Sequence, residues 1–391
     1  MKNVFKLFFV LLLSTGLLLT GCSGDTGNKD TDEPVTGDVI KIGVNYELTG
    51  TVASYGNSSV EGIELAIKQI NEAGGILGKQ IELIKGDTKS EPAEATALAT
   101  KLITQDGVVA IIGPATTGSF KATIPVANKN EVPVISGSAT ADDVTVDDSG
   151  VKEYAFRTCF NDSYQGVTMA NFASESLNAT KAVVIMDNSS DYAIGLAENF
   201  NTTFTENGGE IVATEAYIAG NTDFNAILTK IKGLEYDVIF LPGYYTEAGL
   251  VIKQARDMGI DAPILGADGF DSPTLLELAG ESALNQIYFS NHYSSLDEDP
   301  IVAQFIEDFN AEYGKDPDAF NALGYDTAKF VCDAIVRANS EDPIAIKDAL
   351  AGTTNFVGVT GSFSIDENHN PVKSIVVIEL ADGQPAKSTK I

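Results

Sequence analysis

The chain has 391 residues, a length that suggests two domains. Its 25 Lys and Arg residues are outnumbered by 55 Asp and Glu residues, and the formal net charge of -30 argues against nucleic acid as a partner, because nucleic-acid affinity rests on neutralising phosphates. Hydrophobic residues make up 44%, which favours a folded chain, whereas 3 Cys and 2 His exclude a disulfide scaffold and a His-rich metal site.

Residues 1–22 have the three parts of a secretory signal. Two lysines form a positive start, and the apolar run at 7–19 is shorter than the roughly 20 residues that a transmembrane helix needs. The ending Leu-Thr-Gly-Cys resembles a bacterial lipobox, in which the cysteine is lipidated. We therefore expect a signal peptide at 1–21, a lipid anchor on Cys22 and a location outside the cell membrane. A plain signal peptide with an incidental cysteine is the alternative.

Residues 22–38 begin with that cysteine and continue with small polar residues (SGDTGNKDTDEPVTGD). This composition cannot build a core and predicts a flexible linker. We expect no later segment to span a membrane, because none is long and apolar enough.

After the linker, short β-branched runs alternate with helical periods. Strands are predicted at 39–44, 81–85, 108–112, 132–136, 182–186, 210–216, 238–241 and 264–265. Helices are predicted at 58–73, 92–105, from Thr117, and at 193–207, 224–231 and 247–258. The stretch 301–350 is mostly helical, and strand returns at 361–380. This order predicts the α/β class, with two doubly wound parallel-sheet lobes.

Motifs of common enzymes are missing. No Gly-x-Gly-x-x-Gly follows a strand, no P-loop spacing is present, and no Gly-x-Ser-x-Gly elbow occurs. His292 and His369 lack neighbours that resemble a triad or a metal pair, so we expect each at the surface or in a loop. Cys159 and Cys332 lie far apart in sequence and are expected as buried free thiols, with a disulfide as the alternative. We therefore predict no metal, no cofactor and no enzyme activity.

Ligands of open parallel sheets bind outside the carboxyl ends of the strands, so the loops there are candidates. The loop 113–119 opens a helix, whose unpaired N–H groups together with the hydroxyl of Thr117 suit a carboxylate. Ordinary N-capping is the alternative. The loop 136–140 offers Ser138 and Thr140 to the same ligand, and a polar turn is the alternative there.

Two loops of the second half are also candidates. The loop 266–269 holds Asp268 between glycines, where it is able to pair with a ligand ammonium, although a turn aspartate is the alternative. The loop 242–246 places aromatic residues at a strand end, where an aromatic often forms a pocket wall, with core packing as the alternative for one of its two tyrosines. Each signal is weak alone. Their shared position at strand ends predicts a carboxylate site on one lobe and an ammonium site on the other.

Several longer runs carry a family resemblance over nearly the whole chain after the linker. They lie at 48–56, 70–79, 112–114, 136–140, 156–158 with Asp162 and 165–166, 219–224 and 254–259. The runs Asn-Glu-x-Gly-Gly-Ile-x-Gly and Gly-Asn-Thr-Asp-Phe are fairly specific together. The set resembles the branched-chain (Leu/Ile/Val-type) amino-acid-binding proteins of ABC transporters, which are type I periplasmic binding proteins.

The resemblance implies which residues bind the ligand. The carboxylate-binding hydroxyl falls on Thr117, the contacts of the 136–140 loop fall on Ser138 and Thr140, and the ammonium-binding acid falls on Asp268, where the Leu/Ile/Val proteins carry Glu. The remaining ligand-binding positions are the aromatic Tyr55, Tyr192, Tyr244 and Phe320 and the small Ala115, Thr116 and Ala139.

The resemblance also implies the topology of a two-lobed flytrap with a three-segment hinge. The chain is expected to cross between the lobes near 159–161, 291–294 and 356–360. Lobe 1 then comprises 39–159 and 293–357, and lobe 2 comprises 160–292 and 358–391.

The function implied is that of a lipid-anchored substrate-binding protein of an ABC importer. It is expected to act as a monomer and to close like a hinge around a free amino acid, preferably a branched-chain or aliphatic one. The closed form is expected to deliver this amino acid to a membrane permease. The same fold with another solute (an amide, urea or an aromatic compound) is one alternative, although an acid at position 268 favours a ligand with a cationic group. An extracellular sensor domain or an enzyme is the other.

Overall fold

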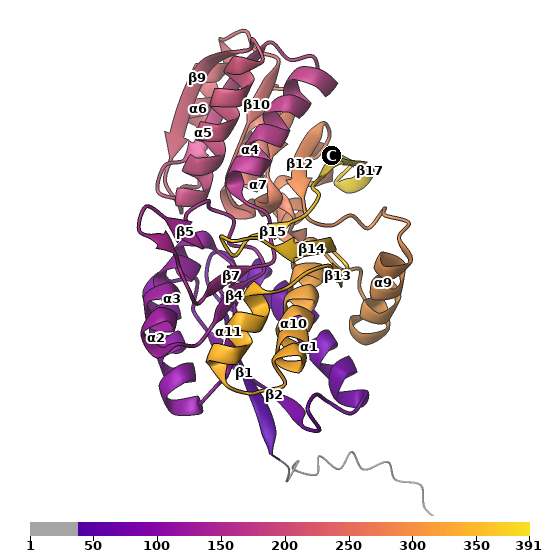
Figure 1. Cartoon of the computed structure of the whole chain (residues 1–391). Coiled ribbons are helices and arrows are strands. Elements are labelled where there is room, and N and C mark those ends of the chain that lie inside the picture. The colour runs from indigo at the N-terminus through magenta and orange to yellow at the C-terminus, as the bar shows by residue number, and fades with distance from the viewer. Residues whose placement is uncertain (1–37) are drawn as a thin grey trace, which may run out of the picture. The chain divides into compact units, whose positions relative to one another are not determined.

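Two separate β-sheets organise the computed structural model, which describes residues 38–391 (Figure 1). The predicted signal peptide at 1–21, Cys22 and the linker up to residue 37 lie outside the described residues. In both sheets, strands alternate with helices along the chain, and the neighbouring strands are mostly parallel. The predicted α/β class with two doubly wound lobes is thereby confirmed.

The first sheet has the strand order β2-β1-β3-β4-β7, and all of its pairs are parallel. Every residue of β1 from Ile42 to Tyr46 is buried, as expected for a sheet covered on both faces. The strands are β1 (Val39–Tyr46), β2 (Gln80–Asp87), β3 (Ala110–Ile112), β4 (Val134–Ser136) and β7 (Ala155–Arg157). The chain between β4 and β7 adds a small hairpin of β5 (Val146–Asp147) and β6 (Gly150–Val151).

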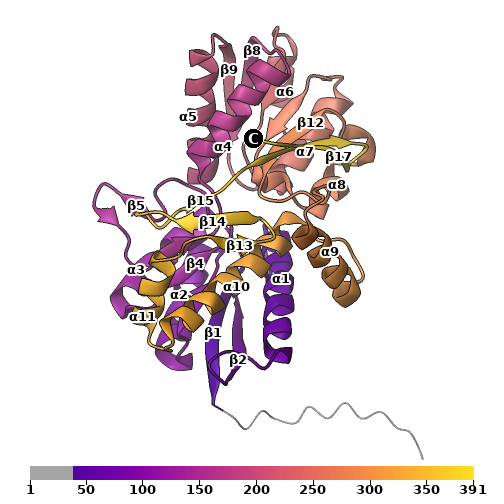
Figure 2. The same ribbon diagram turned by 45° about the vertical axis from the view of Figure 1, so that its right-hand side comes forward.

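Helices pack on both faces of this sheet (Figures 1 and 2). Helix α2 packs with α3, and α1 packs with α10, which comes from much later in the chain. Gly62 of α1 and Gly324 of α10 let these two backbones touch, since a Cβ on either would lie about 2 Å from a carbonyl oxygen of the other helix. The helices are α1 (Ala53–Glu72), α2 (Pro92–Lys101), α3 (Thr117–Asn130), α9 (Pro300–Tyr313), α10 (Ala319–Ala338) and α11 (Pro343–Ala351).

The second sheet has the order β17-β16-β12-β11-β10-β8-β9. Its first five strands in sequence are parallel, and β16 and β17 add an antiparallel edge. The strands are β8 (Lys181–Asp187), β9 (Glu210–Tyr217), β10 (Val238–Phe240), β11 (Ile264–Gly266), β12 (Ile287–Asn291), β16 (Val376–Ala381) and β17 (Gln384–Lys390). The helices are α4 (Asp162–Asn171), α5 (Asp191–Glu206), α6 (Asn225–Lys232), α7 (Tyr245–Asp257) and α8 (Pro273–Ala279).

The chain passes between the two sheets after β7, after β12 and before β16. A separate three-stranded sheet, β13 (Phe356–Gly358), β14 (Gly361–Ile365) and β15 (Pro371–Val372), precedes the last pass. Figures 1 and 2 both show it at the level between the two larger sheets. Because it pairs with neither of them, strand pairing does not assign it to a lobe, and the predicted boundary at 357/358 stays a prediction.

Sequence periodicity found most elements but placed several ends wrongly. Helix α1 begins at Ala53 rather than 58, and the predicted helix 92–105 is an α-helix to Lys101 followed by a π-helical turn. Elements without a clear apolar period were missed, namely α4, α8 and the short or edge strands β5, β6, β7, β12, β13 and β17. Helix α4 is polar, and what starts it is a cap, since the Asn161 side chain accepts from the N–H of Tyr164 at 3.1 Å.

The described helices and cysteines bear on two further predictions. Among residues 38–391, no helix combines the length and the apolar character that crossing a bilayer requires. Cys159 and Cys332 are buried free thiols, as predicted.

Candidate functional site

The carboxyl ends of strands from both larger sheets meet at one small cavity, here called the cleft cavity. Its walls contain all the predicted ligand-binding residues except Ala139 and Thr140. Lobe 1 contributes the first turns of α1, α3 and α10 and the segments after β3 and β4, and lobe 2 contributes the first turn of α5 and the segments after β10 and β11. The lining residues are Tyr55, Ala115, Thr116, Thr117, Ser138, Tyr192, Tyr244, Asp268, Gly269 and Phe320.

On lobe 1, the loop between β3 and α3 is fixed by a buried acid that sequence reasoning missed. Glu47 follows β1 directly and accepts from the N–H of Ala115 at 3.0 Å, the N–H of Thr116 at 3.1 Å and the hydroxyl of Thr116 at 2.9 Å. Burial raises the pKa of the Glu47 carboxyl, and these donors act in the opposite direction. Two N–H groups at the start of α3 are therefore used by the protein itself.

The close fit of this loop also depends on Gly113. Its φ of 93° lies in the left-handed region, and a Cβ there would come within 2.4 Å of the carbonyl oxygen of Asn45. Any larger residue would push the Ala115–Thr117 segment away from β1.

The loop after β4 is braced by Ser136, which precedes the predicted residues. The Ser136 hydroxyl donates to the Pro114 carbonyl at 2.7 Å and accepts from the N–H groups of Ser138 and Ala139. The Ser138 hydroxyl donates to the Ala115 carbonyl at 2.9 Å. The Thr117 hydroxyl oxygen accepts from the N–H of Ala141 at 3.3 Å, which leaves its proton free to donate.

Ala139 and Thr140 lie behind the wall of the cleft cavity and are fully buried. The guanidinium of Arg157 donates to their carbonyl oxygens at 3.3 and 2.9 Å. The structure thus places both residues in the supporting layer of the loop, next to the lining residue Ser138.

On lobe 2, Asp268 is only 4% exposed and is held by three side chains from separate elements. Its Oδ1 accepts from the Tyr192 hydroxyl at 2.7 Å and from Gln165 Nε2 at 3.1 Å, and its Oδ2 lies 3.1 Å from His292 Nε2. Burial lowers the pKa of His292 to about 4, so its imidazole is neutral at neutral pH. None of the three donors therefore brings a positive charge to Asp268.

A second buried acid, Asp162, lies near Asp268 on this wall. Asp162 begins α4 and is fully buried, and burial together with the charge of Asp268 holds the pKa of Asp162 well above its usual range. Gln165 Nε2 lies between the two acids, 3.4 Å from Asp162 Oδ1 and 3.1 Å from Asp268 Oδ1. Because burial and mutual repulsion disfavour ionising both acids, a cation placed beside them would be favoured at the lobe 2 wall.

The histidines lie in loops, which is one of the two predicted settings, but they are more buried than a surface position would be. His292 and His369 are 4% and 9% exposed. His292 stacks on Phe160 and His369 on Phe156, with ring centroids 3.6 and 4.1 Å apart. One sequence feature could have indicated the burial of His292. It directly follows an apolar strand segment, and ligand sites are common at the carboxyl ends of such strands.

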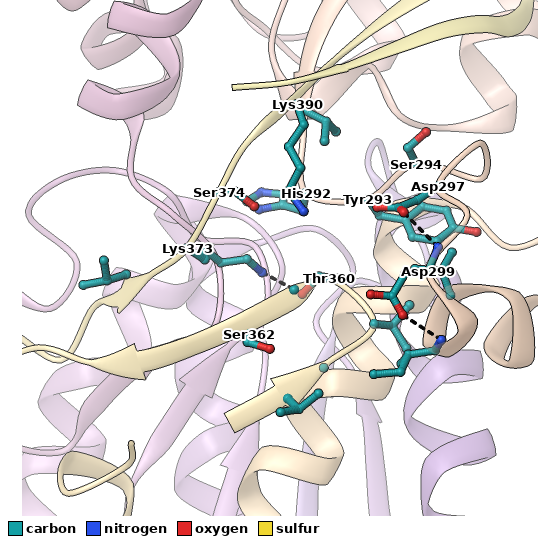
Figure 3. Close-up of a pocket in the computed structure, with 18 residues that line it drawn as sticks. His292, Tyr293, Ser294, Asp297, Asp299, Thr360, Ser362, Lys373, Ser374 and Lys390 are labelled. Carbon is teal, nitrogen blue, oxygen red and sulfur yellow. Dashed lines mark hydrogen bonds between the residues drawn. The ribbon is translucent and has the colours of Figure 1, made fainter. Parts of the chain in front are cut away.

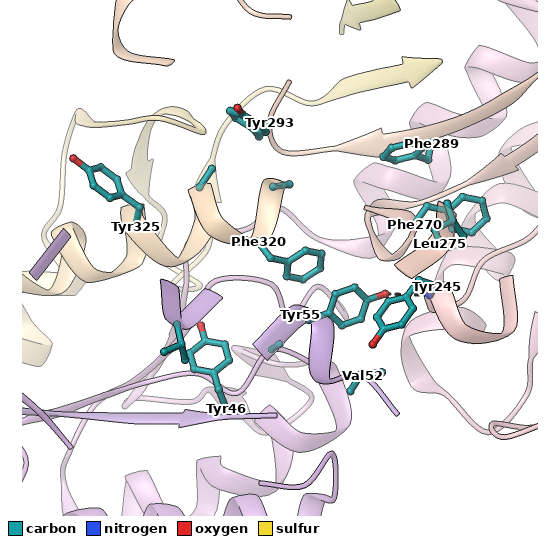
Figure 4. Close-up of a cluster of buried hydrophobic side chains, with 14 of the residues drawn as sticks. Tyr46, Val52, Tyr55, Tyr245, Phe270, Leu275, Phe289, Tyr293, Phe320 and Tyr325 are labelled. Atoms are coloured by element: carbon teal, nitrogen blue, oxygen red, sulfur yellow. Dashed lines mark hydrogen bonds between the residues drawn. The ribbon is translucent and has the colours of Figure 1, made fainter. Parts of the chain in front are cut away.

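Aromatic side chains form the rest of the cleft cavity. Tyr55 stacks on Phe320 with centroids 4.2 Å apart, and Tyr192 stacks on Tyr244 with centroids 5.1 Å apart. Figure 4 shows Tyr55 beside Phe320, with its hydroxyl end near Tyr245. The wall is thus apolar except for the acids and hydroxyl groups at its two sides.

Several hydrogen bonds join the two lobes over the cleft cavity. The Tyr55 hydroxyl donates to the Gly269 carbonyl at 2.5 Å, and the Tyr245 hydroxyl donates to the Thr51 carbonyl at 3.1 Å. Tyr245 was passed over by the sequence prediction in favour of Tyr244. The cavity that remains measures about 10 Å³, which is roughly the space of one water, so an organic ligand enters only if the lobes separate.

A larger cavity of about 470 Å³ lies at the hinge and contains none of the predicted ligand-binding residues. Figure 3 shows its wall, which includes His292, Tyr293, Thr360 and Lys373. The Lys373 ammonium donates to the Thr158 carbonyl at 3.2 Å and to the Thr360 hydroxyl at 2.6 Å, which ties two passes of the chain together. We interpret this cavity as a space between hinge segments, because the buried Lys373 ammonium in its wall already has hydrogen-bond partners within the chain.

The chemistry of the cleft is that of binding. In residues 38–391, no three His, Cys, Asp or Glu side chains gather in a way that would hold a metal ion. The arrangement offers hydroxyl and N–H donors on one wall, uncompensated acid on the other, and aromatic faces between them.

Comparison with known proteins agrees with this geometry. The sequence profile of the family described as "Periplasmic binding protein" matches residues 39–385. The leucine-, isoleucine-, valine-, threonine- and alanine-binding protein of Pseudomonas aeruginosa is 30% identical over 331 residues, which cover 84% of this chain and 86% of that protein.

Two solved structures are similar over most of their length. The branched-chain amino acid transporter substrate binding protein LivJ of Streptococcus pneumoniae, in complex with isoleucine, is 43% identical with a TM-score of 0.87, covering 90% of this chain and 99% of that one. A solute binding protein of an ABC transporter of R. palustris, in complex with benzoate, is 26% identical with a TM-score of 0.80, covering 90% and 96%.

Proposed function

The chain belongs to the periplasmic binding protein family, in the group of binding proteins for branched-chain amino acid ABC transporters, and on that premise we propose that it captures a free branched-chain or other aliphatic amino acid between its lobes. Membership confirms the resemblance predicted from the sequence. It also confirms a binding protein without enzyme activity, since the similar proteins are binding proteins of transporters.

The observation that carries the proposal is the setting of Asp268. Its carboxyl group is buried and receives three hydrogen bonds. Among the described residues, the one basic side chain paired with it is His292, which is neutral, so no cation balances its charge. A buried charge is strongly favoured to find a partner of opposite sign. The ammonium group of an amino acid supplies that partner, which a simple carboxylic acid does not.

The carboxylate of the same ligand is assigned to the lobe 1 wall. The Thr117 hydroxyl is free to donate, and it stands in the first turn of α3, where the helix N-terminus favours a negative group. Because Glu47 occupies the N–H groups of Ala115 and Thr116, the ligand carboxylate is assigned to Thr117 and Ser138 rather than to the whole start of the helix.

The ligand side chain is assigned to the apolar part of the cleft cavity. Tyr55, Phe320 and Tyr244 provide flat apolar faces, and Ala115 leaves space beside them. Such a wall suits an aliphatic side chain, whose burial contributes about 1.5–3 kcal/mol for a residue of the size of valine or leucine.

Binding is proposed to work by hinge closure. Open and closed forms exist in unequal populations, and a ligand that touches both lobes stabilises the closed form. The bonds from Tyr55 and Tyr245 across the cleft are contacts that only the closed form makes. A micromolar dissociation constant corresponds to about -8 kcal/mol, which a desolvated carboxylate, ammonium and side chain are together able to supply.

Delivery and attachment are part of the proposal. The closed monomer would dock on a membrane permease, and Cys22, after signal cleavage, would carry the lipid anchor on a flexible linker. The support for the anchor is the Leu-Thr-Gly-Cys sequence at 19–22, which lies outside the described residues.

The test is isothermal titration calorimetry of the purified chain against each free amino acid and against benzoate. We expect micromolar or tighter binding of leucine, isoleucine or valine and no heat with benzoate. Binding of benzoate with no amino acid bound would support the alternative of an aromatic-acid receptor, which the benzoate-bound neighbour of 26% identity makes a specific second candidate. Absence of binding by any amino acid would refute the proposal.

A further inference from the structure

His292 lies where the chain leaves the second sheet for α9, and its side chain is completely buried. Its ring stacks on Phe160, with centroids 3.6 Å apart and planes inclined by 22°. Phe160 belongs to the segment between β7 and α4, which is the first pass between the sheets. The stack therefore joins two of the three hinge segments, and Figure 3 shows His292 at the wall of the hinge cavity.

The other edge of the same ring reaches the ligand wall. His292 Nε2 lies 3.1 Å from Asp268 Oδ2, and His292 Nδ1 has no hydrogen-bonding partner among the described residues. The charged groups that act on the ring are Asp268, which favours its protonation, and Lys373 and Arg157, which together with burial oppose it. The ring is thus a neutral imidazole that carries its proton on Nε2, and this Nε2–H donates to Asp268.

We propose that His292 is a positioning residue that holds Asp268 in place for the ligand ammonium and couples that acid to the hinge. The assignment of the ammonium rests on the function proposed above, whereas the contact of His292 with Asp268 does not. Since one ring touches both the hinge and the acid, a change in the hinge segments moves Asp268, and a cation at Asp268 stabilises the hinge in its closed arrangement.

The contact is tested first without any ligand. The chain has only 2 His, so nitrogen-15 labelling of histidine gives two imidazole spectra that are readily separated. We expect His292 to show the neutral Nε2–H form from pH 6 to 8. In the Asp268→Asn variant, the His292 nitrogen signals should shift while those of His369 stay unchanged. Unchanged His292 signals in Asp268→Asn would overturn the proposal.

The effect on binding is tested with two replacements of different chemistry. His292→Phe keeps the stack on Phe160 but removes the donor, and we expect leucine and isoleucine affinity to fall about tenfold, as for loss of a hydrogen bond to a charged group. His292→Gln places an amide N–H near the position of Nε2 and should recover most of that loss. Equal affinities for wild type and His292→Phe would contradict a positioning role. So would a His292→Gln variant that melts at the wild-type temperature but does not regain amino-acid affinity.

His369 is the matched control, because it is also buried and stacked on a phenylalanine but contacts the Ala155 carbonyl instead of the cleft. His369→Asn keeps a residue that tolerates the φ of 62° at this position, and it should leave affinity unchanged. If the wild-type chain binds no amino acid while Asp268→Asn still shifts the His292 signals, the contact stands and only the proposed ligand fails.

Discussion

Glu47 on lobe 1 and Asp268 on lobe 2 are both buried acids close to the end of a strand, and they are satisfied in different ways. Glu47 on lobe 1 accepts two backbone N–H groups and one hydroxyl, all from the Ala115–Thr116 corner that it supports. Asp268 on lobe 2 accepts from Tyr192 of α5, Gln165 of α4 and His292 of the hinge, which are side chains from three elements.

On the proposed function, this difference separates a structural acid, Glu47, from a binding acid, Asp268. Backbone donors of a single loop make Glu47 part of that loop, so its removal affects the fold before it affects a ligand. Asp268 is held by side chains that converge from different parts of lobe 2, and such convergence is typical of a site whose geometry is prepared for something outside the chain. The comparison predicts which variants lose affinity and which lose stability.

The largest expected effect on affinity comes from Asp268→Asn. The substitution keeps the size of the side chain but removes its charge, so a bound ammonium would be buried without a counter-charge. We expect amino-acid affinity to fall at least about 100-fold, because breaking a buried ion pair costs about 3–5 kcal/mol. Calorimetry measures the affinity, and a melting temperature near that of wild type shows that the fold persists.

Asp237→Asn is the control for this prediction, since Asp237 lies on lobe 2 but accepts from Thr180 and Lys181 away from the cleft. It should bind amino acids like wild type. If Asp268→Asn retains wild-type affinity, Asp268 is only a turn residue and the two acids do not differ in role.

Glu47→Gln should give the opposite pattern. An amide offers one acceptor oxygen and two donors where three donors now converge, so the N–H of Ala115 or Thr116 loses its partner. We expect unfolding free energy to fall by about 1–3 kcal/mol, the cost of an unsatisfied buried group, with less than about a tenfold change in affinity. Urea denaturation measures the unfolding free energy. The matched control is Glu82→Gln, because Glu82 is an exposed residue of β2. A large loss of affinity with unchanged stability would place Glu47 in direct contact with the ligand.

The two acids also show what the sequence was able to predict. Asp268 lies in a glycine-flanked loop after an apolar strand, a local pattern that is visible in the chain. Glu47 acts on a loop 68 residues later, and nothing near position 47 indicates that pairing. The α/β class was predictable for the same local reason, because alternation of strands and helices is written in neighbouring residues.

What escaped prediction depends on contacts between distant segments. His292 was assigned to a surface or a loop because no titratable neighbour stands beside it in sequence, yet its partners Asp268 and Phe160 are brought to it by the fold. Helix α4 was missed because its cap and its buried polar residues, rather than an apolar period, define it. Polar networks of this kind have no periodicity, whereas apolar faces do.

Tyr55→Phe tests the contact that joins the two walls. The variant keeps the stack on Phe320 but removes the hydroxyl that donates to Gly269 and accepts from the N–H of Tyr245. We expect about tenfold weaker amino-acid binding, since closure leaves two buried groups unpaired. Small-angle X-ray scattering should show a larger radius of gyration at half-saturating ligand than for wild type.

Tyr313→Phe is the matched control, because the Tyr313 hydroxyl donates to the Glu61 carbonyl within lobe 1. It should leave both affinity and scattering unchanged. Equal effects of the two tyrosine variants would mean that the Tyr55 hydroxyl contributes to packing rather than to closure.

The smallest expected effect lies at the edge of the cleft, where Lys121 of α3 is paired with Asp191 of α5 at 2.7 Å and also with Asp143 of its own lobe. Lys121→Met removes the ion pair across the lobes, and exposed pairs contribute about 0.2–1 kcal/mol, so affinity should fall no more than about fivefold. Lys101→Met, which breaks a pair with Asp106 inside lobe 1, should have no effect. Because the Debye length is about 3 Å at 1 M salt, the difference between wild type and Lys121→Met should disappear there. A difference that persists at high salt would mean that Lys121 supports closure by packing and that the charged edge, unlike the two buried acids, has no electrostatic part in binding.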